Sequence, residues 1–426
     1  MASKSNIDKE YKVRDPIYGF IRLDAQEMAI VNSPHFQRLR RIKQLSLTDM
    51  VYPSANHTRF EHSLGVMQMA SDMFENIARN PNTLRRLKLQ LDAVPRIKKI
   101  IRLAALLHDI GHAPFSHSGE DAMPPLPSNH PRYQPNKRKC YTHEDYSIAA
   151  IKFLFRDLIE QHSVCENLGI KAEDIVALLG DQTGLPTRTS IIWKELISGQ
   201  LDADRADYLL RDSLHIGINY GLFDRNRLVS CMTIGESEEE SSFLAIEEGG
   251  WHVAESLVIA RYQMFSQVYF HKVRRIFDYH LGKALQEILR HTEHDEGLFP
   301  EPTTADNLMR YLDCDDWKIS GALKDRKGGE HGDIILNRNP FKYEDEWDHL
   351  PEGAELSEAN EKIKKYGGYI DYGAKTKWYK LDKDIKIFRE KDKKTCSLSM
   401  KSELIKAMPR LPKVIRLYIN QTGRRS

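Results

Sequence analysis

The chain has 426 residues, of which 41% are hydrophobic and 29% charged, and its net charge is close to neutral at +2. This balance excludes wholesale disorder, and the length allows one large domain or two, because single cores stop growing beyond about 250–300 residues. No apolar run of about 18 residues exists and the N-terminus is polar, so the sequence predicts a cytoplasmic protein with neither a membrane span nor a secretory signal.

Two long segments in the first quarter of the chain predict buried helices. Residues 60–78 carry two apolar stripes at helical spacing, and residues 97–109 are apolar all round over their last two turns. The second helix should stop at Gly111, with Pro114 just beyond it. Both segments carry histidines, which makes them the first place to look for a site.

Segments further along the chain predict loops and a hairpin. Residues 122–139 contain five prolines and several basic residues, which preclude regular structure and predict a loop that could cover a site. The acidic turn of residues 235–242 is flanked by short alternating segments that could pair as a hairpin. Gly328 and Gly329 are expected to form a linker, and residues 363–387 are too charged to assign.

The sequence therefore predicts a mainly α fold, with a helical core in residues 1–290 and a smaller, mixed α/β C-terminal lobe in residues 291–426. This lobe is basic from about residue 361. Residues 361–426 hold 19 Lys or Arg and 7 Asp or Glu, a net charge of +12 against −10 for the rest. Such a lobe can bind nucleic acid, a nucleotide effector or an acidic surface of a sister subunit, and a solvated surface explains it equally well.

Histidine and aspartate side chains on these helices predict a metal site within residues 55–215. The candidate ligands are His62 in RFEHSLGV, His108 and Asp109 in LLHDIGHAPFSH, and Asp204 in LDADRADYLLRD. Imidazole and carboxylate groups satisfy Mn, Fe, Ni or Zn without thiolates. A buried Asp beside a buried His must be paired or must coordinate an ion, so we favour metal binding over satisfied core residues.

Residues 202–212 place Asp204, Tyr208 and Asp212 on one face of a helix, at i, i+4 and i+8. Two carboxylates and a phenol on one face are consistent with a site. An exposed helix laced with Asp–Arg pairs explains the same pattern, because arginines lie close by on the helix. This segment alone therefore does not separate the two interpretations.

Three further histidines follow the His–Asp pair: His112, His117 and, beyond the Pro-rich loop, His143. Imidazoles beside a metal are suited to proton transfer and to contact with phosphate oxygens. Glu120 lies three residues after His117, so a helical turn would let it orient that ring. Hydrolysis of a phosphate ester needs an activated water, charge stabilisation on oxygen and a protonated leaving group, and this cluster has candidates for each role.

Ordered motifs between Lys12 and Tyr279 resemble those of the HD-domain dNTP triphosphohydrolases, a family that includes the sterile-alpha-motif and HD-domain dNTPase and bacterial HD dNTPases. The motifs are DPIYGFIRL, FQRLRRIKQL, HTRFEHSLGV, LLHDIGHAPFSH, THEDYS, LDADRADYLLRDSLHIGI and YFHKVRRIFD. The resemblance implies an HD-domain helical core, and it implies that the four candidate ligands named above hold the metal.

The resemblance also implies roles for the side chains around the metal. The residues at the catalytic and phosphate-contacting positions are His112, His117, Glu120 and His143. The residues at the triphosphate-binding positions are Arg59, Arg205, Tyr208, His271 and Lys272. The residues at the sugar and base positions are Gln44, Leu45, Asp212 and Tyr269. In this family, the tyrosine at the position of Tyr269 crowds the place that a 2′-hydroxyl would occupy, and deoxyribose is therefore favoured.

The implied reaction is water attack at the α-phosphate of a dNTP, which releases a deoxynucleoside and inorganic triphosphate, with Mg accompanying the nucleotide. Related members assemble as homo-oligomers, so a dimer or tetramer with a nucleotide activator is expected. The residues at the effector positions are Lys12, Val13, Asn32, Gln37 and Arg40. Asn32 stands where the animal enzyme has the Asp that reads guanine, and Phe270 where it has Gln, so the activator and the preferred base stay open.

Two other interpretations of the same residues stay open. The metal site could act on another nucleotide, such as an NTP, a monophosphate or an oligonucleotide, because fold and metal are shared across such chemistries. The chain could instead be a nucleic-acid-binding regulatory subunit, whose basic lobe would bind with a steep salt dependence. The complete set of four metal-ligand residues favours catalysis.

Overall fold

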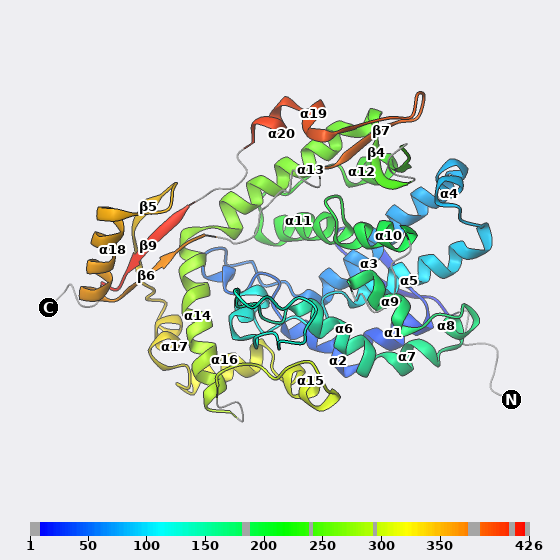
Figure 1. Cartoon of the computed structure of the whole chain (residues 1–426). Helices are drawn as coiled ribbons and strands as arrows, with labels where there is room; N and C mark the ends of the chain where they lie inside the picture. Colours follow the sequence, from blue (N-terminus) through cyan, green and yellow to red (C-terminus); the bar gives the residue numbers. More distant parts are fainter. Residues whose placement is uncertain are drawn as a thin grey trace.

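The computed structural model of the chain describes residues 9–180, 188–237, 242–292, 296–373, 384–408 and 414–421. Helices dominate these ranges and strands form only small sheets, so the predicted mainly α fold is confirmed (Figure 1). None of the helices in this described part of the chain is long and apolar enough to cross a membrane.

A long buried helix, α3 (Arg59–Arg79), lies at the centre of the first half of the chain and packs against α5 (Val94–Leu107) and α11 (Ala203–Ile216). Its N-cap is Thr58, whose backbone N–H and hydroxyl both donate to the Glu61 carboxylate. The other elements of this half are β1 (Tyr11–Asp15), β2 (Gly19–Leu23), α1 (Ala25–Val31), α2 (Pro34–Gln37), η1 (Arg38–Arg41), η2 (Thr48–Met50), α4 (Pro81–Leu87), η3 (Leu91–Ala93), η4 (Ser116–Ala122), α6 (His143–Phe153), α7 (Arg156–Glu160), α8 (Ser163–Asn167), α9 (Ala172–Leu179) and α10 (Arg188–Ser198).

The two helices predicted from periodicity are both present, and α3 matches its predicted range closely. Helix α5 ends at Leu107, earlier than predicted, because the chain then turns tightly. Ile110 N–H donates to Leu107 O over 3.2 Å, and His112 N–H to Asp109 O over 3.1 Å. The His–Asp pair therefore lies in the turn after the helix rather than inside it.

The predicted loop and hairpin are also present. Residues 123–142 contain no helix or strand, only two isolated bridges, between Pro125 and Cys140 and between Gln134 and Lys137. Strands β3 (Met232–Gly235) and β4 (Phe243–Glu247) pair in antiparallel register, as the alternating segments predicted. Residues 238–241 of the predicted acidic turn lie outside the described residues.

The second half of the chain continues with helices that pack on this core. These elements are α12 (Arg225–Cys231), η5 (Glu248–Gly250), α13 (Trp251–Met264), the π-helical turn η6 (Phe265–Tyr269), α14 (Lys272–Arg290), α15 (Ala305–Leu312), α16 (Asp316–Lys324) and α17 (Gly329–Leu336). The prediction of a linker at Gly328 and Gly329 is wrong. Gly328 is the N-cap of α17 and Gly329, with φ of +60°, is its first residue, so glycine here serves a tight turn between two packed helices.

The C-terminal strands belong to two small sheets, one beside α14 and the other beside α13 (Figure 1). One sheet has the order β5-β9-β6, and α18 packs on it. The other has the order β3-β4-β7-β8, in which β7 runs parallel to β4 of the earlier hairpin. The bounds are β5 (Lys342–Trp347), α18 (Gly353–Tyr366), β6 (Gly368–Asp371), β7 (Lys386–Arg389), β8 (Lys394–Ser397), α19 (Leu398–Lys401), α20 (Glu403–Ala407) and β9 (Ile415–Ile419).

The mixed α/β character predicted for the C-terminal lobe is thus confirmed, and residues 363–387, too charged to assign from sequence, contain the end of α18, all of β6 and the first half of β7. Residues 374–383 of that segment lie outside the described residues. The main hydrophobic core runs from Ile21 to Ile405 and so includes side chains on both sides of residue 290. The domain division at that residue stays a prediction.

Candidate active site

The four predicted metal ligands converge from three elements. His62 comes from the first turn of α3, His108 and Asp109 from the turn after α5, and Asp204 from the first turn of α11. His62 Nε2 lies 3.0 Å from Asp204 Oδ1 and 3.5 Å from Asp109 Oδ2. His108 Nε2 lies 3.2 Å from Asp109 Oδ1 and 3.8 Å from Asp204 Oδ1. Residues as far apart in sequence as His62 and Asp204 therefore present nitrogen and oxygen atoms to one point.

The hydrogen bonds of the two histidines leave one nitrogen of each ring free for a ligand. His62 Nδ1 lies 2.8 Å from Asp207 Oδ2, and His108 Nδ1 lies 2.8 Å from Ala105 O. Both partners only accept, so each Nδ1 carries a proton. The Nε2 atoms of both rings are buried without a hydrogen-bond partner, despite the short distance to Asp204, because the geometry is not that of a hydrogen bond. This is the arrangement of metal-ligating histidines.

The residues present fit a divalent cation. Ligand atoms of His62, His108 and Asp204 lie within 4.8 Å of one another. Asp109 joins this group through the distances above, and its Oδ2 also accepts from Arg59. Two imidazoles with two carboxylates accept several first-row ions.

The electrostatics of the cluster favour a positive charge at its centre. Burial alone would lower the pKa of His62, but Asp204, Asp207 and Asp109 outweigh burial and raise it to about 10. Burial would raise the pKa of Asp109, yet Arg59 and the neighbouring histidines hold it well below its usual range. A metal ion must therefore displace a tightly held proton from His62, which makes its binding pH-dependent.

A second cluster adjoins the first and contains the predicted catalytic residues. Glu120 Oε1 lies 3.0 Å from His117 Nδ1 and 2.6 Å from His143 Nδ1, so one carboxylate orients two rings. His112 stacks on His143 with ring centroids 3.8 Å apart, and its Nε2 lies 3.4 Å from Asp109 Oδ1. The predicted contact between Glu120 and His117 is present, and α6 adds the third histidine.

Neighbouring groups push the pKa values of these histidines apart. Burial would lower the pKa of His143, but Glu144 and Glu120 raise it to about 9. Burial, with Arg59 and His143, holds the pKa of His112 well below its usual range. One ring of the stacked pair is therefore protonated and the other neutral at pH 7, which is the separation that acid–base chemistry needs.

The arginines predicted to bind triphosphate are paired with carboxylates in this structure. Arg59 donates to Asp109 and, through Nε, to Ser116 Oγ over 2.7 Å, whereas Arg205 donates to the buried Asp202. Both arginines are held beside the two clusters by these contacts. A phosphate group would compete for the same donors.

Arg261 on α13 is a candidate phosphate ligand that the sequence analysis did not find. Its side chain is buried, and its Nε and Nη1 have no hydrogen-bond partner. Burial lowers its pKa, and Arg205 lowers it further, while Tyr208 and Asp202 oppose this. A buried guanidinium with unused donors next to another arginine fits an anionic ligand. The signal in the sequence was a lone arginine in the apolar run LVIARYQM.

The residues predicted to meet the sugar lie together as well. Asp212 accepts from Tyr269 Oη over 2.6 Å and lies 2.7 Å from His57 Nε2, so both of its oxygens are held. Tyr269 ends the π-helical turn η6, and such turns are frequent at functional sites. Gln44 and Leu45 are buried, and Gln44 Oε1 has no partner and is free to accept a hydrogen bond. The sequence did not identify His57 as a site residue, because no pattern near it indicates its contact with Asp212, 155 positions later.

Other predicted residues have partners away from the two clusters. The Lys272 ammonium lies 4.4 Å from the Tyr343 ring centroid, and His271 Nδ1 accepts from Val273 N–H at the start of α14. The structure thus does not bring these two side chains into either histidine cluster. Tyr208, in contrast, stacks edge-on against Tyr269 at 6.1 Å.

The predicted effector residues come from β1 and from the segment of residues 32–40. Arg40 donates through Nε to Gln37 Oε1 over 2.8 Å, and its guanidinium lies 3.5 Å from the Phe60 ring centroid. Lys12 on β1 and Asn32 after α1 are exposed, and Val13 is half-buried. Of these five residues, Gln37 and Arg40 are joined by a hydrogen bond.

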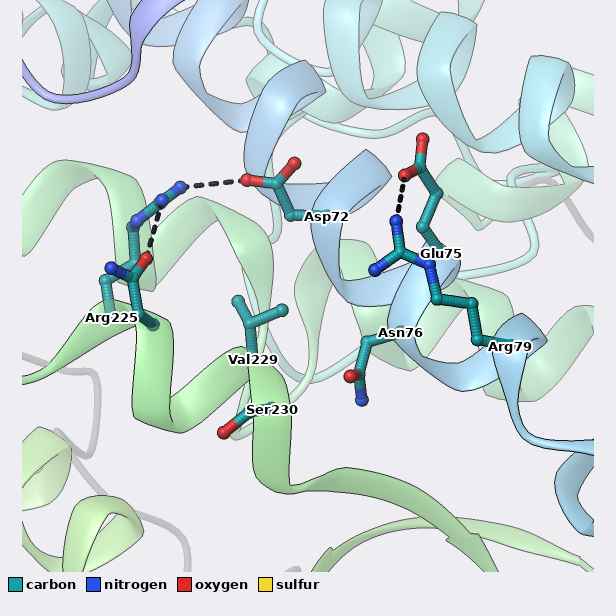
Figure 2. A pocket seen from close by; sticks show the side chains of 8 residues that line it. Asp72, Glu75, Asn76, Arg79, Arg225, Val229 and Ser230 are labelled. Atoms are coloured by element: carbon teal, nitrogen blue, oxygen red, sulfur yellow. Dashed lines mark hydrogen bonds and ion pairs between the residues drawn. The ribbon is translucent and has the colours of Figure 1, made fainter.

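A groove between α3 and α12 lies apart from these residues (Figure 2). Its charges are largely satisfied internally: Arg225 donates to Asp72 over 2.8 Å, and Arg79 to Glu75 over 3.4 Å. None of the predicted site residues lines it. The groove is therefore no alternative to the histidine clusters as the reaction site.

Comparison with known families identifies an HD domain over residues 59–211 and an HD associated region over residues 223–343. An uncharacterized protein of Methanocaldococcus jannaschii is 37% identical over 64% of this chain and 49% of its own length. The deoxynucleoside triphosphate triphosphohydrolase SAMHD1 homolog of Dictyostelium discoideum is 28% identical over 78% of this chain and 60% of its own. The deoxynucleoside triphosphate triphosphohydrolase SAMHD1 of Homo sapiens is 29% identical over 64% of this chain and 44% of its own length. The chain spans about half the length of these curated relatives.

Solved structures extend the similarity to almost the whole chain. A hypothetical protein from Aquifex aeolicus superposes with a TM-score of 0.73 and 29% identity over 97% of both chains. A phosphohydrolase from Bacteroides thetaiotaomicron also has a TM-score of 0.73, with 25% identity over 97% of this chain and 100% of that one.

Proposed function

This chain belongs to the HD-domain phosphohydrolases, and we propose that within this family it is a metal-dependent deoxynucleoside triphosphate triphosphohydrolase. The observation that carries the proposal is the pair of buried Nε2 atoms on His62 and His108, which face Asp109 and Asp204 without a hydrogen-bond partner. The similarity to SAMHD1 proteins, whose name states this activity, supports the choice of substrate.

The metal would be held by His62, His108, Asp109 and Asp204, and Mn, Fe, Ni and Zn all suit two imidazoles with two carboxylates. Such an ion, when bound, supplies Lewis acidity to a phosphate oxygen and lowers the pKa of a coordinated water. The protein's part is to hold the imidazoles in one tautomer. Asp207 and the carbonyl of Ala105 do so from the far side of the rings.

Arginine side chains would carry the charge of the triphosphate, with any accompanying Mg. Arg59 and Arg205 would exchange their carboxylate partners for phosphate oxygens, and Arg261 already has unused donors. Tyr208 follows Arg205 by three residues on α11, and Arg261 and Arg205 both counteract the burial that raises the pKa of Tyr208. His271 and Lys272 would join only after moving toward the phosphates from their present partners.

The second cluster would manage the protons. Water attacks the α-phosphorus and the bond from that phosphorus to the 5′-oxygen breaks, so the leaving oxygen must gain a proton and the water must lose one. His143, protonated and paired with Glu120, is the candidate acid, whereas neutral His112 is a candidate acceptor. His117 shares Glu120 and is exposed, which suits a contact with phosphate.

Selection for deoxyribose would come from Asp212 and Tyr269, whose hydrogen bond leaves the phenol in a defined place. Gln44 has a free acceptor for a sugar hydroxyl, and Leu45 would pack on the sugar or base. A nucleotide activator at Lys12, Val13, Asn32, Gln37 and Arg40, a homo-oligomer, and nucleic-acid binding by the basic C-terminal lobe are further parts of the proposal.

Product analysis tests the proposed reaction directly. Purified protein with Mn²⁺ is incubated with each of the four dNTPs and NTPs, with and without a second nucleotide, in ¹⁸O-labelled water. Deoxynucleoside and inorganic triphosphate are expected, with the label only in the triphosphate. Monophosphate with pyrophosphate, label in the nucleoside, or faster attack on NTPs would each contradict the proposal.

A further inference from the structure

The start of α16, residues 314–316, lies against the loops that carry predicted site residues, although it comes from the HD associated region. Cys314 O accepts from Arg38 Nε over 3.1 Å and from Nη2 over 2.7 Å, and Asp315 pairs with Arg41. Asp316, the next residue, is 4% exposed. The start of α16 therefore contacts the segment of residues 38–43, about 270 positions earlier in the chain.

The Asp316 carboxylate joins two loops of the HD region. Its Oδ2 accepts from the backbone N–H of Lys43 over 2.8 Å, and its Oδ1 accepts from the N–H of Phe115 over 2.6 Å. Helix α16 does not need Asp316 as a cap, because the N-cap Asp315 accepts from Lys318 N–H over 2.9 Å. Both oxygens of Asp316 therefore serve loops outside its own helix.

The loop at Phe115 is strained, and its conformation needs an external support. Phe115 and the next residue, Ser116, both have φ of +57°, in the left-handed region that non-glycine residues avoid. Each such residue costs on the order of 1–2 kcal/mol, so two in succession persist only when neighbours hold them. The hydrogen bond from Phe115 N–H to Asp316 is one such contact.

The turn at Phe115 and Ser116 holds Arg59, a predicted phosphate ligand, in place. Ser116 Oγ accepts from Arg59 Nε over 2.7 Å and donates to Lys43 O over 2.6 Å. The segment that Asp316 supports at Phe115 also lies between His112 and His117 of the second cluster. A chain of direct contacts thus runs from Asp316 through the turn to Arg59.

We infer that Asp316 is a positioning residue that holds the turn at Phe115 and Ser116 and thereby aims Arg59 at the triphosphate. The inference rests on the proposed function for the identity of the ligand. Among the described residues, Asp316 makes no hydrogen bond or ion pair with the four predicted metal ligands, and its path to Asp109 runs through Ser116 and Arg59.

The test compares D316N with D315N, which makes the same carboxylate-to-amide substitution at the neighbouring position but spares the two loop contacts. An amide at position 316 keeps one acceptor and presents its N–H₂ to a second N–H, so one loop hydrogen bond is lost. We expect D316N to weaken binding of inorganic triphosphate by about 10–100-fold, and to lower kcat/KM similarly, since small displacements cost that much. Deoxynucleoside and Mn²⁺ affinities should stay within about twofold of wild type, as should all values for D315N.

A double-mutant cycle separates positioning from general stability. S116A should reproduce the loss of triphosphate binding, and D316N with S116A together should be no worse than either alone, because both act through one turn. Additive losses, or equal values for D316N and D315N, would overturn the inference, as would parallel losses of Mn²⁺ affinity and melting temperature. If the wild-type chain releases no triphosphate from any dNTP, the proposed function fails. The positioning role would still be supported in that case if D316N bound triphosphate more weakly than D315N. Equal binding by the two variants in that case overturns both.

Discussion

The Nδ1 atom of His62 lies 2.8 Å from Oδ2 of Asp207, and both side chains are completely buried. Asp207 also accepts from Arg211 Nε and Nη2, each over 2.8 Å, and from Tyr18 Oη over 2.9 Å. Burial would raise the pKa of Asp207, but Arg211 and His62 outweigh it and lower the pKa to about 2. The carboxylate stays ionised, and it therefore directs Nε2 of His62 toward the candidate metal site.

Replacing Asp207 with Asn should weaken metal binding by about 10–100-fold, the usual effect of removing the partner of a ligating histidine. The amide no longer selects one tautomer of His62, so part of the population presents a protonated Nε2. Titration calorimetry with Mn²⁺ measures the loss. D72N is the matched control, since Asp72 pairs with Arg225 in the groove of Figure 2. Unchanged affinity in D207N would refute the orienting role.

Replacing Gly65 with Ala should disturb the same network from its other side. A Cβ at Gly65 would lie 2.0 Å from Asp207 Oδ1 and 2.3 Å from Arg211 Nη2, so the buried pair must move. We expect a loss of about 1–3 kcal/mol in the free energy of unfolding, typical of overpacking. In G321A, where a Cβ meets nothing within 4 Å on helix α16, stability should instead rise slightly. Denaturant unfolding of both variants decides the matter, and equal stabilities would count against the packing argument.

Removal of metal should abolish activity and also reduce stability. A chelator leaves Asp109 and Asp204 around the protonated His62, and the free energy of metal binding is lost from the folded state. At a free Mn²⁺ concentration about 100 times Kd, that contribution is about 2.7 kcal/mol. Differential scanning fluorimetry with and without Mn²⁺ measures the shift. D109A, which lacks one of the predicted ligands, should melt at the same temperature under both conditions.

Replacing Arg261 with Gln should separate ligand binding from stability. The guanidinium has unused donors at a buried position, so its removal should weaken triphosphate binding by about 10–100-fold, the range for hydrogen bonds to charged groups. The unfolding free energy of the ligand-free protein should not fall, because a buried unpartnered charge is unfavourable. The exposed Arg227, which donates to Gly249 O, supplies the control variant R227Q. A fall in both stability and affinity would indicate a structural role.

Protonation of His280 should destabilise the fold as the pH falls. Its Nε2 accepts from Phe341 N–H over 3.2 Å, and its Nδ1 lies 2.8 Å from His331 Nδ1, so neither contact tolerates a doubly protonated pair. Burial, with His331, lowers the pKa of His280 from 6.5 to about 3.

Between these two values the unfolded chain binds the additional proton, so the unfolding free energy decreases on acidification, by at most about 1.4 kcal/mol per pH unit. Denaturant unfolding between pH 7 and pH 5 should show a shallower decrease for H280L than for wild type. The exposed His252 provides the control H252Q, whose slope should match that of wild type. A wild-type slope in H280L would contradict the assignment.

The sequence alone determined the parts that depend on near neighbours in the chain. Apolar side chains at helical spacing predicted α3, and alternating segments on either side of an acidic turn predicted the hairpin of β3 and β4. The site residues in the HD motifs could be named because each stands in a distinctive local block. Two of the elements that carry them, α3 and α5, had been predicted as buried helices, whereas residues 202–212 had been left open between a site and an exposed helix. Adjacent glycines occur both in linkers and in tight turns at helix ends, and at Gly328 the prediction of a linker was wrong.

Only the tertiary structure decided which distant group completes each site residue. Asp207 orients His62 from 145 positions away, and Asp316 joins the loop at Lys43 from 273 positions away. Arg261 has significance only because it is buried next to Arg205 with donors unused. A hydrogen bond across the core leaves no periodicity in either segment, and burial of a charge depends on every element packed around it. Such relationships arise when the helices meet, and no local pattern encodes them.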